Sequence, residues 1–298
     1  MFSVIFPGQG SQLVGMGSEL YDKHSLIQNL FKEADDTLGY SLSKLILQGS
    51  KEELDLTENT QPAIFLLSYS IFKILKKDFN INLDKASFFA GHSLGEYSAL
   101  ACSNALTFSD TLKILKIRGQ AMQDSVPKGV GGMVAVLGSK IEIVEKILEE
   151  NQSKYECFIA NDNSEGQIVI SGTIEDLEKL MIDLKSNNIK NIKLPVSAPF
   201  HCKLMNKATN IMRDEIAKLN FKKPNNILIS NVTGKEILTT IELKDLLIKQ
   251  IESRVRWRES VLFMINEGIN QFIEIGPGKV LSGLIKRIDK NVKVSAIN

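Results

Sequence analysis

Short apolar runs alternate along the chain with longer stretches in which apolar residues recur every three or four positions. The short runs predict strands and the longer stretches predict helices. Such alternation is typical of an α/β protein with a mostly parallel sheet. The predicted elements of the N-terminal part are a strand over Phe2–Phe6, a helix opening at Thr60-Gln61-Pro62, a strand over Ala86–Ala90, a helix over Leu94–Ala101 and a helix capped by Ser109.

The middle of the chain has a different pattern, with the order β-α-β-β-α-β of a ferredoxin-like arrangement. We therefore expect residues 126–199 to form a small subdomain inserted into a large α/β subdomain of residues 1–125 and 200–298. The predicted elements of the insert are strands over Met133–Leu137, Cys157–Ala160, Ile168–Ile170 and Ile189–Val196, with helices over Ile141–Glu150 and Ile174–Ser186. Those after it are a helix over Met205–Leu219, strands over Ile227–Ser230 and Phe272–Ile275, and a helix after Gly278.

Composition narrows the class of protein. Of the 298 residues 43% are hydrophobic and 24% are charged, as in a folded globular chain. The 36 Lys and Arg residues balance 35 Asp and Glu residues, so no overall field attracts nucleic acid or a membrane surface. Three scattered cysteines (Cys102, Cys157 and Cys202) predict neither a disulfide framework nor a zinc site. With no run of about 18 apolar residues and no basic leader, we expect a cytoplasmic protein.

A serine lies between a predicted strand and a predicted helix in Gly91-His92-Ser93-Leu94-Gly95, a G-x-S-x-G pattern. A nucleophilic serine on such a sharp turn has an unfavourable backbone conformation, and flanking glycines remove side chains that would clash there. The N-terminus of the following helix offers free N–H groups where an oxyanion would form. We therefore predict that Ser93 is a nucleophile, with an ordinary turn as the alternative.

A serine nucleophile needs a base, and the chain has three histidines. His24 is expected on an early surface helix, and the side chain of His92 should leave the turn in another direction from Ser93. His201 lies where the chain leaves the predicted small subdomain, and clefts between subdomains are favoured sites. Elimination makes His201 the candidate base, with a hydrogen-bonded structural histidine as the alternative. No Asp or Glu can be picked to orient it.

Two further features are compatible with binding an anion. The loop Gly8-Gln9-Gly10 follows the first predicted strand and could present backbone N–H groups, although a plain turn is an equal alternative. Arg118 falls one helix after Ser93 among apolar residues, and a guanidinium pairs in two-pronged fashion with a carboxylate. A solvated or ion-paired helix arginine is the alternative reading of Arg118.

Together these segments resemble the malonyl-CoA:acyl carrier protein transacylase family nearly from end to end. One such motif would be weak evidence, whereas eight in the same order are very specific. The matching segments are Phe6-Pro-Gly-Gln-Gly-Ser-Gln12, Thr60-Gln-Pro-Ala63, Gly91-His-Ser-Leu-Gly-Glu-Tyr97, Arg118-Gly119, Asn163-Ser164 with Gly166-Gln167, Pro199-Phe-His201, Gln250 with Val255-Arg-Trp257, and Glu274-Ile-Gly-Pro-Gly278.

The resemblance implies an α/β-hydrolase-like core with an inserted ferredoxin-like subdomain. It implies transfer of the malonyl group from malonyl-CoA to the phosphopantetheine thiol of acyl carrier protein, through a malonyl-serine intermediate, for fatty-acid synthesis. No permanently bound cofactor and no metal are expected.

Residue by residue, the resemblance makes Ser93 the acylated nucleophile and His201 its general base. The family steadies this histidine with a main-chain carbonyl, here that of Gln250, which suits the missing acid. The bulky Phe200 resembles the malonyl-selective form of the family. The remaining assignments are the backbone N–H groups of Gln9 and Leu94 for the oxyanion hole and Arg118 for the free carboxylate of the malonyl group.

The implied carrier-protein partner is acidic, and we expect a monomeric enzyme with no nucleic-acid or membrane partner. Lys190, Lys193 and Lys286 are candidates for a basic rim, with ordinary solvated charges as the alternative. A serine hydrolase, an idle interaction module and an acyltransferase of polyketide assembly are rival interpretations. The first of these needs no buried arginine, and the stand-alone length favours a discrete fatty-acid enzyme over the last.

Overall fold

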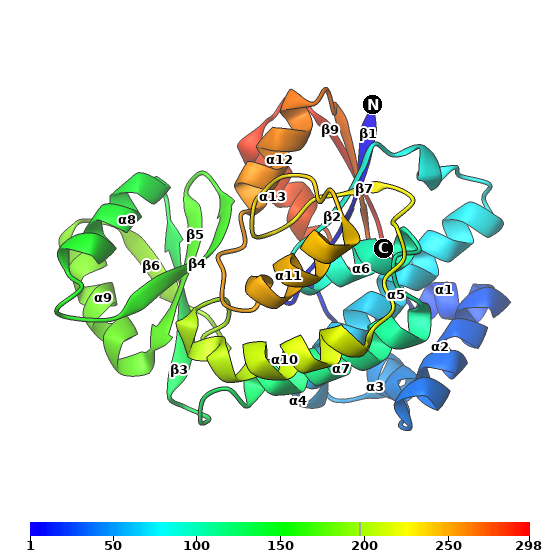
Figure 1. Cartoon of the computed structure of the whole chain (residues 1–298), viewed down its shortest axis with the longest axis horizontal. Helices are drawn as coiled ribbons and strands as arrows, with labels where there is room; N and C mark the ends of the chain where they lie inside the picture. Colours follow the sequence, from blue (N-terminus) through cyan, green and yellow to red (C-terminus); the bar gives the residue numbers. More distant parts are fainter. Residues whose placement is uncertain (197) are drawn as a thin grey trace.

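A parallel sheet forms the centre of the larger part of the molecule (Figure 1). The structure is a computed structural model that describes residues 1–196 and 198–298. The strand order is β7-β2-β1-β8-β9, and each pair of neighbours is parallel. The strands are β1 (Phe2–Phe6), β2 (Phe88–Gly91), β7 (Ile227–Leu228), β8 (Gln271–Ile275) and β9 (Lys293–Ile297).

Helices cover both faces of this sheet, so its strands are apolar on both sides. Successive side chains of β1 point to opposite faces: Val4 and Phe6 join the core under the helices of one face, and Ile5 joins the core under those of the other. The first core includes α2 (Ser25–Leu38), α3 (Leu42–Gln48), α5 (Thr57–Lys77), α6 (Leu94–Cys102), α7 (Phe108–Gln123), α10 (Asn206–Lys218) and α11 (Thr240–Gln250), and the second α12 (Trp257–Asn266) and α13 (Val280–Ile288). Two short helices, α1 (Ser18–Lys23) and α4 (Lys51–Leu54), complete this part.

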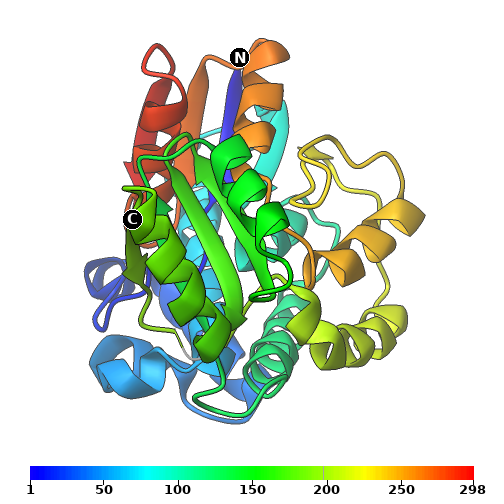
Figure 2. The same ribbon diagram turned by 90° about the vertical axis from the view of Figure 1, so that its left-hand side faces the viewer.

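A second, antiparallel sheet with two helices forms the small subdomain (Figure 2). Its strand order is β4-β5-β3-β6, so the first strand lies between the third and the fourth, as in the ferredoxin-like arrangement. The mixed α/β fold with a parallel sheet and a smaller antiparallel one is confirmed, whereas the boundaries at 126 and 199 stay a prediction. The elements are β3 (Gly131–Leu137), α8 (Ile141–Glu150), β4 (Cys157–Ser164), β5 (Gln167–Thr173), α9 (Ile174–Ser186) and β6 (Lys190–Lys193).

Two of the expected helix starts are wrong. Helix α5 begins at Thr57, so Pro62 lies inside it rather than at its opening. The hydroxyl of Thr60 donates to the carbonyls of Leu54 and Leu56, which anchors the turn before the proline. Helix α7 is capped by Thr107, whose hydroxyl accepts the Asp110 N–H at 3.0 Å, and not by Ser109.

Some elements and segments lie outside what the sequence patterns predicted. Helices α11 and α12 and strand β9 were not predicted from the pattern. Ser197, which belongs to the segment that precedes His201, lies outside the described residues. None of the described helices combines the length and the apolar character needed to cross a lipid bilayer.

Helices α5 and α7 pack closely because Gly119 has no side chain. A Cβ atom at Gly119 would lie 2.5 Å from the Thr57 carbonyl oxygen and 2.6 Å from Glu58 Cα, which is closer than such atoms can approach. At Gly283, inside α13, an added Cβ would meet nothing within 4 Å. These two helical glycines therefore form a matched pair for testing the close contact.

We predict that Gly119→Ala lowers the free energy of unfolding by about 1–3 kcal/mol through overpacking. Gly283→Ala should leave it unchanged or raise it by up to about 1 kcal/mol, because alanine favours helix in open space. Urea denaturation midpoints of both variants and the wild type provide the measurement. Equal midpoints for the two variants would contradict the packing that we describe between α5 and α7.

Candidate active site

Ser93 lies on the sharp turn between β2 and α6, with φ 54° and ψ −110°. A left-handed φ is uncommon for a residue with a side chain, so neighbouring packing must hold it in place. A Cβ on Gly91 would lie 2.0 Å from the Gly95 carbonyl carbon, and one on Gly95 would lie 2.3 Å from the Phe6 oxygen. The Ser93 N–H donates to Asn231 Oδ1 at 2.7 Å. The two glycines of the motif therefore let the turn close tightly enough to present the serine.

His201 lies beside Ser93, with Nε2 at 2.8 Å from the serine Oγ. Its Nδ1 is 2.9 Å from the main-chain oxygen of Gln250. Because a carbonyl only accepts, Nδ1 carries the proton, which leaves Nε2 free to accept the proton of Ser93. His201 is 4% exposed. The Ser171 hydroxyl donates to the carbonyl of Phe200, the residue before His201, at 2.6 Å. This geometry fits the base that elimination selected.

Burial is the largest cause that lowers the pKa of His201 to about 3, and the nearby charge of Arg118 acts in the same direction. The histidine is therefore neutral, and able to act as a base, at neutral and mildly acidic pH. Its Nδ1 is hydrogen-bonded to a carbonyl rather than to a carboxylate, so this contact adds no full negative charge that would raise the pKa again.

Arg118 is 1% exposed and lies on α7 with its guanidinium against Ser93. One Nη donates to Gln61 Oε1 at 2.8 Å, and the other donates to Gln250 Oε1 at 2.8 Å and to Ser93 Oγ at 3.0 Å. Within residues 1–196 and 198–298 it forms no ion pair with a carboxylate, and its Nε has no hydrogen-bond partner. A buried cation held by neutral amides is ready to receive an anion.

The backbone N–H groups of Gln9 and Leu94 make no hydrogen bond to any other described residue. Leu94 is the first residue of α6, where N–H groups have no acceptor within the helix. Gln9 belongs to the loop after β1 and lines the same cavity as Ser93. Both donors are thus available for an oxyanion near the serine.

The side chains of Ser93, Arg118 and His201 line a cavity of about 940 Å³ between the two subdomains. Its walls include Arg118 and Met122 of the large subdomain and Met133, Val169 and Leu194 of the small subdomain and the segment after it. That volume suits a small-molecule or cofactor-sized ligand. No group of His, Cys, Asp and Glu side chains in the described part of the chain could hold a metal ion.

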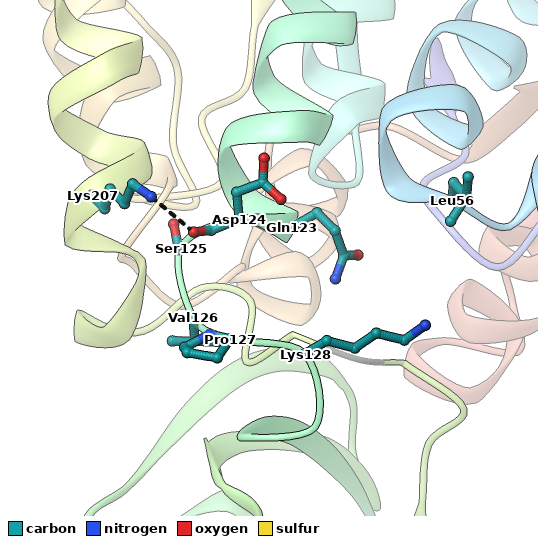
Figure 3. A pocket seen from close by; sticks show the side chains of 8 residues that line it. All are labelled: Leu56, Gln123, Asp124, Ser125, Val126, Pro127, Lys128 and Lys207. Atoms are coloured by element: carbon teal, nitrogen blue, oxygen red, sulfur yellow. Dashed lines mark hydrogen bonds between the residues drawn. The ribbon is translucent and has the colours of Figure 1, made fainter.

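A second cavity of about 500 Å³ adjoins the first, since Leu56 and Gln123 line both. In Figure 3 Lys128 extends across it in the direction of Leu56, and Lys207 lies opposite, donating to the Asp124 carbonyl at 3.2 Å. Both lysines therefore place positive charge beside the cavity that Ser93 lines.

The three lysines expected at a basic rim do not line either cavity. Lys190 and Lys193 are exposed on the edge strand β6, and Lys286 donates to the carbonyls of Lys290 and Val292. Their role in binding a partner stays a prediction.

The other two histidines serve different contacts. His92 points to the small subdomain, where its Nε2 lies 2.8 Å from Asn163 Oδ1. His24 lies between α1 and α2 rather than on a helix, with Nδ1 3.0 Å from Asp78 Oδ2. The sequence interpretation of His24 as a surface residue without a role at the site is compatible with that contact, although its helical placement was wrong.

Sequence reasoning missed three polar residues that complete the site: Gln61, Glu96 and Asn231. Gln61 and Glu96 belong to motifs that carried the family resemblance. The motifs did not predict that Gln61 is a buried partner of Arg118, or that Glu96 is a buried partner of Gln250. Nothing in the pattern around Asn231 pointed to the Ser93 turn, 138 positions away.

The sequence matches the family described as acyl transferase domain over residues 3–297. The chain belongs to the acyl transferase family. A malonyl CoA-acyl carrier protein transacylase of Bacillus subtilis is 42% identical over 99% of this chain and 92% of its own length. The crystal structure of an acyl-carrier-protein-S-malonyltransferase from Bartonella henselae is 40% identical, covers 99% of this chain and 95% of its own, and superposes with a TM-score of 0.96.

A third relative is a malonyl-transacylase solved in complex with a type II polyketide synthase acyl-carrier protein. It is 36% identical, covers all of this chain and 96% of its own, and has a TM-score of 0.96. Within the acyl transferase family, the chain is therefore a member of the malonyl CoA-acyl carrier protein transacylases, as the sequence motifs suggested.

The lowered pKa of His201 predicts an unusual pH profile for the reactivity of Ser93. A histidine with a pKa of about 6.5 would lose roughly tenfold of its neutral form at pH 5.5, whereas His201 should lose almost none. We therefore expect the rate at which a neutral organophosphonate labels Ser93 to be nearly constant from pH 8 to pH 5.5. Intact mass measured against time gives this rate, and Ser93→Ala is the blank. A fall with a midpoint near pH 6.5 would show that His201 keeps an ordinary pKa.

Proposed function

We propose that this enzyme transfers a malonyl group from malonyl-CoA to the phosphopantetheine thiol of an acyl carrier protein. The observation that carries the proposal is the contact of the Arg118 guanidinium with Ser93 Oγ at 3.0 Å, with neutral amides as its other side-chain hydrogen-bond partners. A cation at this distance from the nucleophile can hold an acyl group that ends in a carboxylate. The names of the relatives point to the same acyl group and the same acceptor.

In the first half of the reaction Ser93 Oγ attacks the thioester carbonyl of malonyl-CoA while His201 Nε2 accepts its proton. The tetrahedral oxyanion lies where the backbone N–H groups of Gln9 and Leu94 can donate to it. When the C–S bond breaks, His201 returns the proton to the departing CoA sulfur. General acid–base catalysis of this kind contributes roughly 10²–10⁴-fold in rate.

In the second half the phosphopantetheine thiol of the carrier protein occupies the place that CoA has left. Its proton passes to His201 Nε2, its sulfur attacks the malonyl-serine ester, and Ser93 Oγ leaves with the proton that His201 returns. The same base thus serves both halves, because its neutral form is restored after each. The main-chain oxygen of Gln250 holds the imidazole in the required tautomer throughout.

Arg118 gives the reaction its acyl selectivity. An acetyl group would occupy the site without pairing the buried guanidinium, and a polar group left unpaired costs on the order of several kcal/mol of binding. The malonyl carboxylate replaces hydrogen bonds to neutral groups with a charge-assisted pair. Phe200, which lines the cavity beside His201, limits the space for a branched acyl chain.

The proposal includes malonyl-CoA as the donor, a monomeric enzyme, a cytoplasmic location and fatty-acid synthesis as the destination of the product. A carrier protein of a polyketide pathway is a second possible acceptor, since one relative was solved with such a partner. Transfer assays with purified carrier proteins of each kind separate these two destinations.

Brief mixing with malonyl-CoA should add a malonyl group to wild-type protein and none to Ser93→Ala. We expect Arg118→Ala to lower malonyl loading by at least about 100-fold, since a charge-assisted pair in a buried site is lost. Intact-protein mass spectrometry, with acetyl-CoA as the parallel donor, makes the measurement. Labelling of Arg118→Ala by the neutral organophosphonate shows that its Ser93 remains folded and reactive.

Equal loading by acetyl-CoA and malonyl-CoA would refute malonyl selectivity. Rapid loss of the adduct to water without any carrier protein would instead favour the hydrolase interpretation.

A further inference from the structure

Glu96 is a buried carboxyl group that the mechanism above does not use. It lies in the first turn of α6, three residues after Ser93, and is 1% exposed. Its Oε2 accepts hydrogen bonds from Gln250 Nε2 at 2.6 Å and from the Asn231 backbone N–H at 3.2 Å. Its Oε1 has no partner among the described residues. A buried carboxyl with such contacts needs an explanation.

The contact with Gln250 decides which way the amide of that side chain points. The Gln250 NH₂ group donates to Glu96 and, at 3.2 Å, to the Ser93 carbonyl, while Gln250 Oε1 accepts from Arg118. A guanidinium can only donate, and Glu96 Oε2 accepts, so an inverted amide would place donor against donor and acceptor against acceptor. Glu96 therefore keeps the amide oxygen on the side of Arg118.

The contact with Asn231 reaches the nucleophile by a second route. Asn231 Oδ1 accepts the Ser93 N–H at 2.7 Å, and its Nδ2 donates to the Gly91 carbonyl at 2.7 Å. The Glu96 carboxyl holds the backbone of Asn231, and the Asn231 side chain forms hydrogen bonds to both ends of the strained segment from Gly91 to Ser93. Glu96 Oε2 is thus hydrogen-bonded on one side to Asn231, which holds the Ser93 turn. On the other side it is hydrogen-bonded to Gln250, which orients both Arg118 and His201.

We propose that Glu96 is a positioning residue for acyl selectivity: by fixing the Gln250 amide, it holds the Arg118 guanidinium at the distance from Ser93 that a malonyl carboxylate requires. This inference rests on the proposed function and deepens it. Glu96 touches no reacting atom, so its effect passes through Gln250 and should appear in the choice between acyl groups.

The acceptor role does not depend on the ionisation of Glu96. Burial raises the pKa of Glu96 to about 7, so both forms are populated near neutrality. Because Oε2 faces two donors, the proton of the neutral form resides on Oε1, and Oε2 accepts in both forms. A glutamine at this position can present its amide oxygen in the same place, whereas methionine has a similar length and no acceptor.

The test is competition between equal concentrations of malonyl-CoA and acetyl-CoA for Ser93, read as the ratio of the two adducts by intact mass. We expect Glu96→Gln to keep this ratio within about twofold of wild type, and Glu96→Met to lower it by at least about tenfold, since the Gln250 amide then loses its shortest orienting contact and keeps only the 3.2 Å bond from its NH₂ group to the Ser93 carbonyl. If Glu96→Met does not fold, Glu96→Asp replaces it, because the shorter side chain withdraws the acceptor from Gln250. Organophosphonate labelling of Ser93 confirms that each variant has an intact nucleophile.

Glu274→Met is the matched control. Glu274 is equally buried, at 0% exposed, but its carboxyl accepts from the backbone of Leu281 and Ser282 at the start of α13, away from the cleft. This variant should lose thermal stability and keep the wild-type adduct ratio. An unchanged ratio in Glu96→Met, or an equal loss in Glu96→Gln and Glu96→Met, would overturn the proposal. Failure of wild type to prefer malonyl would instead refute the proposed function itself.

Discussion

A buried positive charge beside the nucleophile is the constraint on which the rest of the site depends. Arg118 is held by the amide oxygens of Gln61 and Gln250, which orient the guanidinium without cancelling its charge. Under the proposed function, a carboxylate in either place would form the ion pair with Arg118 that the malonyl carboxylate is proposed to form. The helices that carry these residues must therefore pack closely, and Gly119 allows α7 to approach the start of α5.

The same charge explains why a dyad suits this site. A carboxylate behind His201 would raise the pKa of the imidazole and would also compete for the nearby guanidinium. The main-chain oxygen of Gln250 fixes the tautomer at 2.9 Å and carries no net charge. The histidine stays neutral, so it can accept a proton from a serine and later from a thiol. Gln250 thus orients the base with its backbone and the cation with its side chain.

Local patterns predicted what is local in the chain. The strand–turn–helix around Ser93 and the limits of α8 and α9 could be predicted, since each depends on neighbouring residues. The site's polar framework could not, because Gln61 and Gln250 meet Arg118 across 57 and 132 positions of sequence. The family resemblance supplied the role of Gln250, although helix α11, which ends at that residue, went unpredicted.

Three consecutive residues of β4 hold the small subdomain against the large one. Asn161 forms a main-chain bridge with Val255, Asp162 forms an ion pair with Arg258 at 2.9 Å, and Asn163 meets His92 of the Ser93 turn. Since these contacts anchor one wall of the cleft to the turn itself, the cavity has a defined width around the nucleophile. Under the proposed function, the acyl group is selected inside that cavity, at Arg118. The carrier protein would instead be recognised on the outer surface, from which its phosphopantetheine arm reaches the cavity. Acyl selectivity and partner selectivity would then depend on separate residues and could change independently.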